Sequence, residues 1–241
     1  MTRILVLNGN TTQAVTDRIA DAARAAAPEG VTVEAMTAPY GLPLIVTRAD
    51  WLLSGPPILE ALAARRGTYD AAVIAVFGDP ALEAAKLLLD VPVIGISEAA
   101  FHAAAMLGRR FGIVSFTAAL RPMFEDCLDH HGLRGRCAGF RMGPVDASYP
   151  AQLGAAETAE LLALIDQSIA LDGAEAVILA GGPLAGLAAV LQPSVAVPLV
   201  DGTVAAVRLA AALAGMPRPA RPRQPRVLTG YGAEVTSLYG A

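Results

Sequence analysis

The hydrophobic residues of this chain form short continuous runs that alternate with longer segments of helical spacing. β-strands are predicted by the apolar runs at 4–7, 71–77, 91–96, 112–116, 138–142, 175–180 and 196–200, and by the alternation at 31–35. α-helices are predicted at 11–26, 58–66, 81–89, 99–107, 120–130, 155–171 and 203–213. This regular alternation is typical of βαβ units and of a parallel sheet.

The second half of the chain repeats the pattern of the first. The run at 73–80 has a counterpart at 177–183, and both end in a glycine and proline turn before a helical segment. Two further pairs keep nearly the same offset, 91–95 with 197–201 and 3–8 with 110–115. Two halves that face each other would place their strand-end loops across one cleft, which is where open α/β sheets bind ligands.

A segment of alternating proline and arginine at 216–226 predicts an extended connector. We interpret it as a crossing from the second half back to the first. The expected first lobe therefore comprises residues 1–98 together with 216–241, and the expected second lobe comprises residues 99–215.

The composition indicates a soluble protein. Hydrophobic residues make up 54% of the 241 residues, yet no apolar run reaches the roughly 18 residues of a membrane span. The first apolar run is too short for a signal peptide, so we expect a cytoplasmic protein without a membrane partner. The net charge is −4 and the basic residues are mostly scattered, which argues against a nucleic-acid partner.

The chain contains two cysteines, Cys127 and Cys137, and neither lies at a predicted strand end. Buried, inert thiols are the default interpretation of both. His130 and His131 end a predicted helix, and no metal-binding partner is spaced from them in the sequence. The sequence therefore predicts no metal site.

Polar residues follow the first predicted strand. Asn10, Thr11 and Thr12 lie at the start of a helix, where their amide and hydroxyl groups would suit a carboxylate or a polarised carbonyl. Helix capping explains the same residues equally well. The irregular segment at 39–57 resembles a lid, which makes Tyr40 a candidate substrate contact, whereas Trp51 is interpreted as a packing residue.

Candidate acid–base groups lie near the other predicted strand ends. Glu98 and His102 are four residues apart on one face of a predicted helix, where they could hydrogen-bond beside the cleft. A capping glutamate and a packed histidine are the alternative. Asp79 and Asp201 are either site carboxylates or helix caps.

Five motifs keep their order along the chain: NGNTT at 8–12, FGDP at 77–80, VIGISEAA at 93–100, LGRRF at 107–111 and PLVDG at 198–202. Together they resemble the hydantoin and allantoin racemase branch of the aspartate/glutamate racemase superfamily, from Ile4 to Leu213. The resemblance implies an α/β fold of two pseudo-symmetric Rossmann-like lobes with parallel sheets and a small substrate in the cleft between them. It also implies catalysis without cofactor or metal, and homo-oligomers.

In the family that the motifs resemble, two cysteines face opposite sides of the substrate's stereocentre; one removes a proton and the other returns one. The resemblance places Val76 and Gly181 at these positions, and neither side chain can transfer a proton. General acid–base steps contribute about 10²–10⁴-fold each, so we do not expect two-thiol racemisation. An apolar Val76 and an open Gly181 suggest a pocket reshaped for different chemistry or for a bulkier ligand.

Three functions stay open at this point. An isomerase or epimerase would act on a small carbonyl, carboxylate or hydantoin-like substrate with Asp79, Glu98 or His102 in place of the thiols. A lyase, decarboxylase or cyclase would stabilise an enolate-like anion on backbone N–H groups, and a non-catalytic homologue would only bind the ligand. The candidate substrate contacts are Asn10, Thr11, Thr12, Tyr40, Val76, Phe77, Ser115, Phe116, Thr117, Gly181, Gly182, Pro183 and Asp201.

Overall fold

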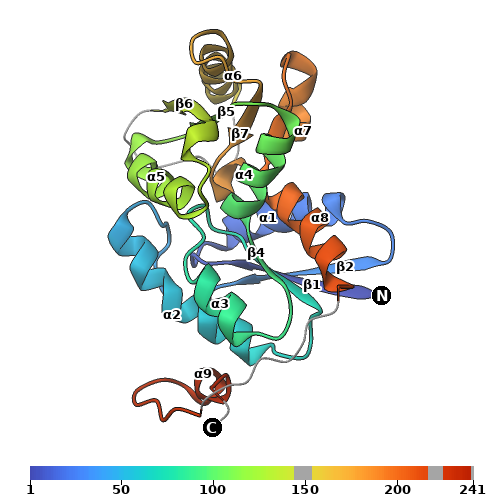
Figure 1. Ribbon diagram of the computed structural model, residues 1–241, viewed down its shortest axis with the longest axis vertical. Coiled ribbons are helices and arrows are strands. Elements are labelled where there is room, and N and C mark those ends of the chain that lie inside the picture. Colours follow the sequence, from blue (N-terminus) through green and yellow to red (C-terminus); the bar gives the residue numbers. More distant parts are fainter. Residues whose placement is uncertain (144–153, 217–224, 240–241) are drawn as a thin grey trace.

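The computed structural model describes residues 1–143, 154–216 and 225–239 and contains two parallel sheets (Figure 1). The first sheet has the order β2 (Val31–Thr37), β1 (Thr2–Asn8), β3 (Ala71–Ile74) and β4 (Val93–Gly95). The second has the order β6 (Cys137–Met142), β5 (Phe111–Ser115), β7 (Ala176–Leu179) and β8 (Leu199–Asp201). The equal strand order confirms the two-lobed α/β fold that the repeated pattern predicts.

The central strands are mostly hydrophobic because both faces of each sheet are covered. Every residue of β3, β5 and β7 is buried. The covering helices are α1 (Gln13–Ala26), α2 (Arg48–Ala64), α3 (Leu82–Leu88), α4 (Ile96–Leu107), α5 (Arg121–His130), α6 (Ala155–Ala170), α7 (Leu187–Leu191) and α8 (Gly202–Ala214). Most predicted elements are therefore present, with ends that differ by a few residues.

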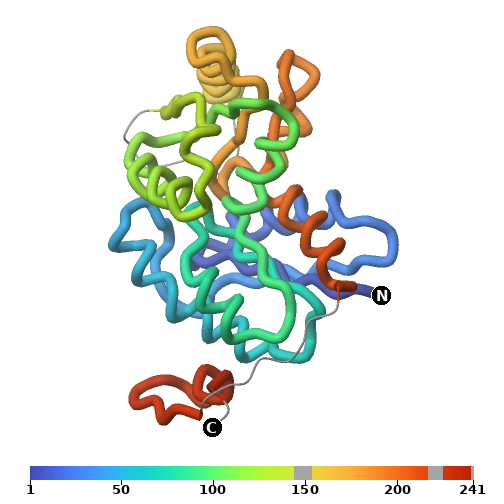
Figure 2. The backbone as a smooth tube through the Cα atoms, in the orientation of Figure 1, coloured from blue at the N-terminus to red at the C-terminus, as the bar shows by residue number. Residues whose placement is uncertain are grey.

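Helices α4 and α8 exchange sheets. Helix α4 follows β4 of the first sheet but contacts β7 and β8, and α8 follows β8 but contacts β1, β3 and β4. In Figure 2 the green segment rises from the lower lobe and the orange segment returns to it. The helices meet at their N-termini, where a methyl group on Gly202 would lie 2.7 Å from the Ile96 carbonyl oxygen. The predicted lobe boundaries stay a prediction, but α8, which they assign to the second lobe, packs on the first sheet.

The segment at 39–57 is more regular than predicted. Helix α2 begins at Arg48, because Thr47 and Asp50 form a capping box at its start. Pro56 and Pro57 lie inside this helix, although proline lacks the N–H that an interior position donates. The prolines predict a break, but the helix continues because its start is capped and its inner face is buried. The prediction of an irregular segment to residue 57 is therefore wrong.

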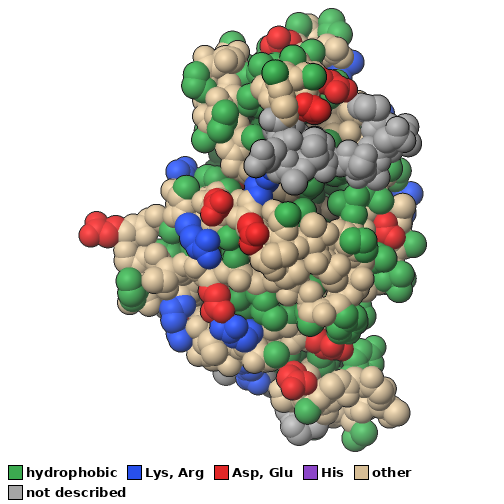
Figure 3. Space-filling model, turned by 180° about the vertical axis from the view of Figure 1, so that it is seen from behind, with side chains coloured by type: hydrophobic (Ala, Val, Ile, Leu, Met, Phe, Trp, Pro, Cys, Tyr) green, Lys and Arg blue, Asp and Glu red, His purple; other side chains and the backbone are tan. Residues whose placement is uncertain are grey.

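The C-terminal segment returns to the first lobe. Helix α9 (Ala233–Ser237) packs on α2 of the first lobe, and the crossing from the second lobe stays a prediction. The connector at 217–224 lies outside the described residues. None of the helices in residues 1–143, 154–216 and 225–239 combines the length and apolar character needed to cross a membrane. On the face shown in Figure 3, acidic and basic side chains are interspersed rather than gathered by sign.

Replacing Ser168 with alanine is expected to raise the free energy of unfolding by about 1 kcal/mol. Its hydroxyl is fully buried beside Gly112 and has no hydrogen-bond partner in the structure. Urea denaturation of the Ser168→Ala variant measures the change. Ser97→Ala is the matched control and should lose stability, since the Ser97 hydroxyl accepts a hydrogen bond from the Gly78 N–H at 2.6 Å. A loss of stability in Ser168→Ala would contradict the expectation.

Candidate functional site

The loops after β3 and β7 meet between the two sheets and enclose a cavity of about 30 Å³. We call this the interlobe cavity. It brings together seven of the predicted contacts from four separate loops, namely Asn10, Val76, Phe77, Phe116, Gly181, Gly182 and Pro183, with Leu44, Ile45, Ala75 and Leu120 completing the wall. The structure thus brings these seven residues together, and their contact with a substrate stays a prediction.

A phenylalanine fills part of the interlobe cavity. A methyl group placed on Gly181 would lie 2.9 Å from Cε1 of Phe116, so this ring occupies the space that the missing side chain leaves. Gly181 has a φ of 126°, which L side chains rarely adopt. About 30 Å³ holds little more than a water molecule. The expectation of a pocket enlarged for a bulkier ligand is therefore wrong for this conformation.

Backbone N–H groups supply the free hydrogen-bond donors of the cavity wall. In the described part of the chain, the N–H groups of Val76, Phe77, Gly181 and Gly182 have no hydrogen-bond acceptor. None of the wall residues in the described part of the chain is titratable. This part of the wall can therefore bind an anion or a polarised carbonyl through amides, but its side chains cannot supply a general acid or base.

The polar residues after β1 are engaged with one another. Asn10 Oδ1 accepts hydrogen bonds from Asn8 Nδ2 and from the Thr12 N–H, both at 2.9 Å. The Thr12 hydroxyl donates to the Pro43 carbonyl, and the Thr11 N–H donates to the Leu42 carbonyl. These contacts hold segment 39–47 against the end of β1, and Thr12, the N-cap residue of α1, makes no side-chain capping hydrogen bond.

Four other predicted contacts lie outside the cavity wall. Tyr40 is half exposed; partial burial and the neighbouring Glu60 raise the pKa of its hydroxyl. The Ser115 hydroxyl donates to the Ala180 carbonyl at 2.6 Å, and the Thr117 hydroxyl accepts from the Ala119 N–H. Asp201 caps α8 through the Thr203 N–H at 2.8 Å. Their contact with a substrate stays a prediction.

Asp79 is a helix cap in this structure. Its carboxylate accepts hydrogen bonds from the Ser97 N–H at 2.9 Å and the Glu98 N–H at 2.7 Å, the first turn of α4. Its backbone is left-handed, with a φ of 50°, a conformation that aspartate tolerates better than most residues. This geometry turns the carboxylate away from the interlobe cavity.

The other two acid–base candidates also lie away from the interlobe cavity. Glu98 forms an ion pair with Lys86 at 2.5 Å, and His102 is exposed on α4. Neither lines the cavity wall. Their catalytic roles stay predictions, and the structure brings neither to the place where the substrate was expected.

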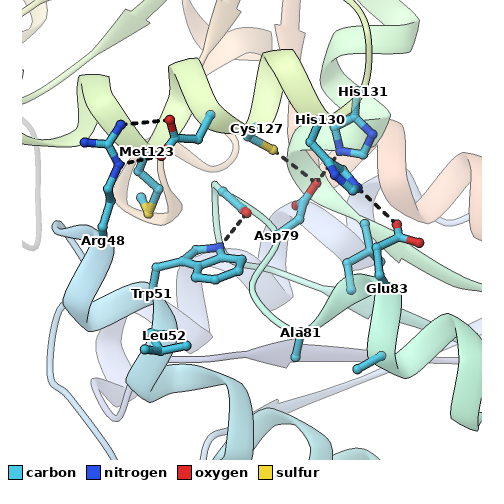
Figure 4. A pocket seen from close by; sticks show the side chains of 14 residues that line it. Arg48, Trp51, Leu52, Asp79, Ala81, Glu83, Met123, Cys127, His130 and His131 are labelled. Atoms are coloured by element: carbon cyan, nitrogen blue, oxygen red, sulfur yellow. Dashed lines mark hydrogen bonds and ion pairs between the residues drawn. The ribbon is translucent and has the colours of Figure 1, made fainter.

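A second and larger cavity, of about 600 Å³, lies between α2, α3 and α5 (Figure 4). We call it the α5 pocket. Asp79, Cys127 and His131 meet on its wall, and the Trp51 indole donates to the Gly78 carbonyl at 2.7 Å. Burial and the Asp79 carboxylate raise the pKa of the Cys127 thiol. As predicted, this thiol is buried, but it does not lie apart from other reactive groups.

The sequence interpretation missed the α5 pocket for an identifiable reason. Cys127 and His131 are four residues apart at the end of one helix, a spacing that places them on one face. Their partner Asp79 comes from the loop after β3, and only the packing of α5 against that loop joins them. The sequence therefore contained one signal for this site, the spacing of Cys127 and His131. It gave no indication of the third residue, Asp79.

An exposed ion pair joins the lobes at the edge of the α5 pocket. Arg48 of α2 donates to Asp126 of α5 at 2.8 Å, and this arginine lowers the pKa of the Asp126 carboxyl below its ordinary value of 3.8. Both side chains are more than half exposed. Solvent screens the pair, so its contribution to stability is expected to be small.

The stabilisation by the Arg48–Asp126 pair depends on pH in the direction set by the lowered pKa of Asp126. A depressed folded-state pKa adds stability above pH 3.8, and this stability is lost as the pH falls below that value. We expect Asp126→Asn to be slightly less stable than the unaltered protein at about pH 6, with the difference shrinking towards about pH 3. Urea denaturation at both pH values checks this. An equal difference at both would show that the pair's charge contributes nothing.

Comparison with known proteins agrees with this architecture. A sequence model of the family described as Asp/Glu/Hydantoin racemase matches residues 4–210. Hydantoin racemase of Pseudomonas sp. (strain NS671) is 34% identical over 215 residues, which cover 86% of this chain and 84% of the relative. Allantoin racemase from Klebsiella pneumoniae superposes with a TM-score of 0.84 at 33% identity, covering 88% of this chain and 87% of the other.

More distant proteins share the fold alone. Arylmalonate decarboxylase superposes with a TM-score of 0.62 over 91% of this chain and 96% of its own, but it is only 17% identical. The two-lobed architecture therefore extends beyond the hydantoin and allantoin racemases. Together, the family match over most of the chain and the two relatives above 30% identity show that this chain belongs to the Asp/Glu/hydantoin racemase family.

Proposed function

We propose that this protein is a racemase-family enzyme that binds a small carboxylate or hydantoin-like compound in the interlobe cavity and stabilises an enolate-like anion there without thiols. Of the three functions considered, the geometry favours the lyase. The single observation that carries this choice is that, among residues 1–143, 154–216 and 225–239, the cavity wall has unpartnered backbone N–H groups and no titratable side chain.

Decarboxylation illustrates why such a wall favours a lyase. The bond between the α-carbon and the carboxylate breaks, its electron pair forms an enolate with the neighbouring carbonyl, and carbon dioxide leaves. The N–H groups of Val76, Phe77 and Gly181 stabilise the developing oxyanion. The α-carbon then takes a proton from water. No step requires a side-chain base to remove a proton, which racemisation does require.

The relatives support the substrate class. Proteins named hydantoin racemase and allantoin racemase are 33–34% identical over most of this chain. Hydantoins and carboxylates both present carbonyl oxygens next to an acidic carbon, so one set of N–H donors suits either. A substrate of this size exceeds the closed cavity, and its entry requires Phe116 or the lobes to move.

The relatives also favour a second candidate, an isomerase. Sequence identity of 34% to a hydantoin racemase favours stereochemical exchange at a carbon next to a carbonyl. Asp79, Glu98 and His102 are the remaining candidates for that proton transfer, and each would have to reach the interlobe cavity after a rearrangement.

Incubation in D2O separates these functions. Single enantiomers of 5-substituted hydantoins are followed by NMR and polarimetry, and achiral 2-substituted malonates are followed by NMR. We expect loss of carboxylate from a malonate with one deuteron gained, and no exchange on the hydantoins. Exchange at the hydantoin stereocentre that survives Cys127→Ser would support the isomerase instead. Saturable binding without any reaction would overturn both enzyme functions in favour of a binding protein.

Two glycine variants assign any activity to the interlobe cavity. Gly181→Ala adds a methyl group against Phe116 at a strained backbone position, and it should abolish turnover. Gly135→Ala is the matched control, because a methyl group there meets nothing within 4 Å. Equal activity of both variants would place the reaction elsewhere.

A further inference from the structure

Three metal-ligand atoms converge on the wall of the α5 pocket. An oxygen of Asp79, the Cys127 sulfur and Nε2 of His131 all lie within 4.8 Å of one another. Asp79 Oδ2 is 3.9 Å from the sulfur and 3.6 Å from the imidazole nitrogen. Figure 4 shows the three side chains pointing towards one another from the β3 loop and the end of α5.

The histidine nitrogen is buried without a partner. The His131 side chain is only 8% exposed, and its Nε2 atom makes no hydrogen bond. Asp79 at 3.6 Å is too distant to supply one. A buried nitrogen without a protein partner costs about 1–3 kcal/mol unless water or an ion binds it.

We propose that Asp79, Cys127 and His131 bind a divalent transition-metal ion of the zinc class in the α5 pocket. Sulfur, imidazole nitrogen and carboxylate oxygen together suit zinc, whereas magnesium and calcium take oxygen ligands. Zinc–ligand bonds of about 2.0–2.3 Å hold tetrahedral ligand atoms about 3–4 Å apart. The distances of Asp79 Oδ2 to the other two atoms fall in this range.

The surrounding residues hold the carboxylate ligand in place. Asp79 keeps its orientation through the N–H groups of Ser97 and Glu98 at the start of α4. Partners of this kind orient metal ligands and typically change metal affinity by about 10–100-fold. These two hydrogen bonds thus orient the Asp79 carboxylate in the absence of a metal ion.

The fourth coordination position faces the open part of the α5 pocket. Three protein ligands leave one position of a tetrahedral ion free, as in catalytic rather than structural zinc sites. The pocket of about 600 Å³ beside it has Trp51, Leu52 and Met123 among its wall residues. A small molecule with an apolar body and one metal-binding group would fit this position. This site is distinct from the interlobe cavity, so it does not depend on the proposed lyase activity.

Cobalt(II) is the probe for this site. Protein freed of metal with a chelator is titrated with CoCl2, and thiolate coordination is read from the near-ultraviolet sulfur-to-cobalt absorption band. Competition with ZnCl2 then gives the zinc affinity. We expect one saturable site and a raised melting temperature with zinc. Cys127→Ser should abolish the near-ultraviolet band, and His131→Gln should weaken binding by about 100-fold or more.

Matched controls separate ligation from general effects of substitution. Cys137→Ser removes the other thiol, and His102→Gln removes an exposed imidazole near the site; both should bind cobalt like the unaltered protein. Circular dichroism establishes that each variant is folded. Equal cobalt affinity in Cys127→Ser, His131→Gln and the unaltered protein would overturn the proposal, as would the lack of a saturable absorption change in the unaltered protein. Asp79, Cys127 and His131 would then be a buried polar cluster without a metal.

Discussion

Replacement of Asp79 with alanine is expected to lower the free energy of unfolding by about 3 kcal/mol. The variant loses two charge-assisted hydrogen bonds to the first turn of α4, at 2.9 and 2.7 Å, and leaves both N–H groups buried or nearly so. It also loses a negative charge at the positive end of a helix dipole. Because α4 crosses to the second sheet, this cap stabilises the contact between the lobes as well as the helix.

Urea denaturation in the presence of a chelator measures this loss without any contribution from bound metal. Asp79→Asn keeps one acceptor and tolerates the left-handed backbone, so its loss should be smaller than that of alanine. Asp166→Ala on the exposed face of α6 is the matched control and should change stability little. A loss below about 1 kcal/mol in Asp79→Ala would show that the cap contributes far less than its geometry indicates.

Replacement of Phe116 with alanine is expected to lower the free energy of unfolding by about 3–5 kcal/mol and to open the interlobe cavity. The ring is 8% exposed and fills the space beside Gly181. Removing it should let the cavity bind hydantoins with larger substituents than the unaltered protein accepts. Ligand affinity is measured by calorimetry with a series of 5-substituted hydantoins, and stability by urea denaturation.

Phe111→Ala is the matched control for this variant. Phe111 is fully buried on β5 but does not line the interlobe cavity. It should lose a similar amount of stability without any change in ligand size preference. Phe116→Leu, a milder change, keeps the test available if the alanine variant unfolds. An unchanged size preference in the folded Phe116 variant would mean that ligands bind elsewhere.

The fold was predictable because its signals are local. The continuous apolar runs at 71–77 and 175–180 identify buried central strands without knowledge of their neighbours, and the repeat identifies the second lobe. The start of α2 was missed because Pro56 and Pro57 predict a break, whereas a capping box at Thr47 and packing of the inner face decide the outcome. The exchange of α4 and α8 between sheets has no local signal at all.

In the candidate sites, too, local features were predictable and features that depend on tertiary packing were not. The wall of the interlobe cavity was predictable because parallel strands place their C-terminal loops at one edge. Closure by Phe116 depends on which rotamer packs over Gly181, which the sequence does not specify. The α5 pocket joins Asp79 to Cys127 and His131, groups about 50 residues apart, through tertiary packing alone.

A small carbonyl or carboxylate ligand is expected to bind to backbone N–H groups of the interlobe cavity. Titration of 15N-labelled protein with a 2-substituted malonate tests this binding, and the amide chemical shifts are the readout. We predict saturable chemical-shift changes at the amides of Val76, Phe77 and Gly181. We expect no such change that depends on ligand binding in the α5 pocket. Chemical-shift changes confined to residues around Asp79 and His131 would contradict ligand binding in the interlobe cavity. The lack of a saturable change at every amide of the cavity wall would contradict it as well.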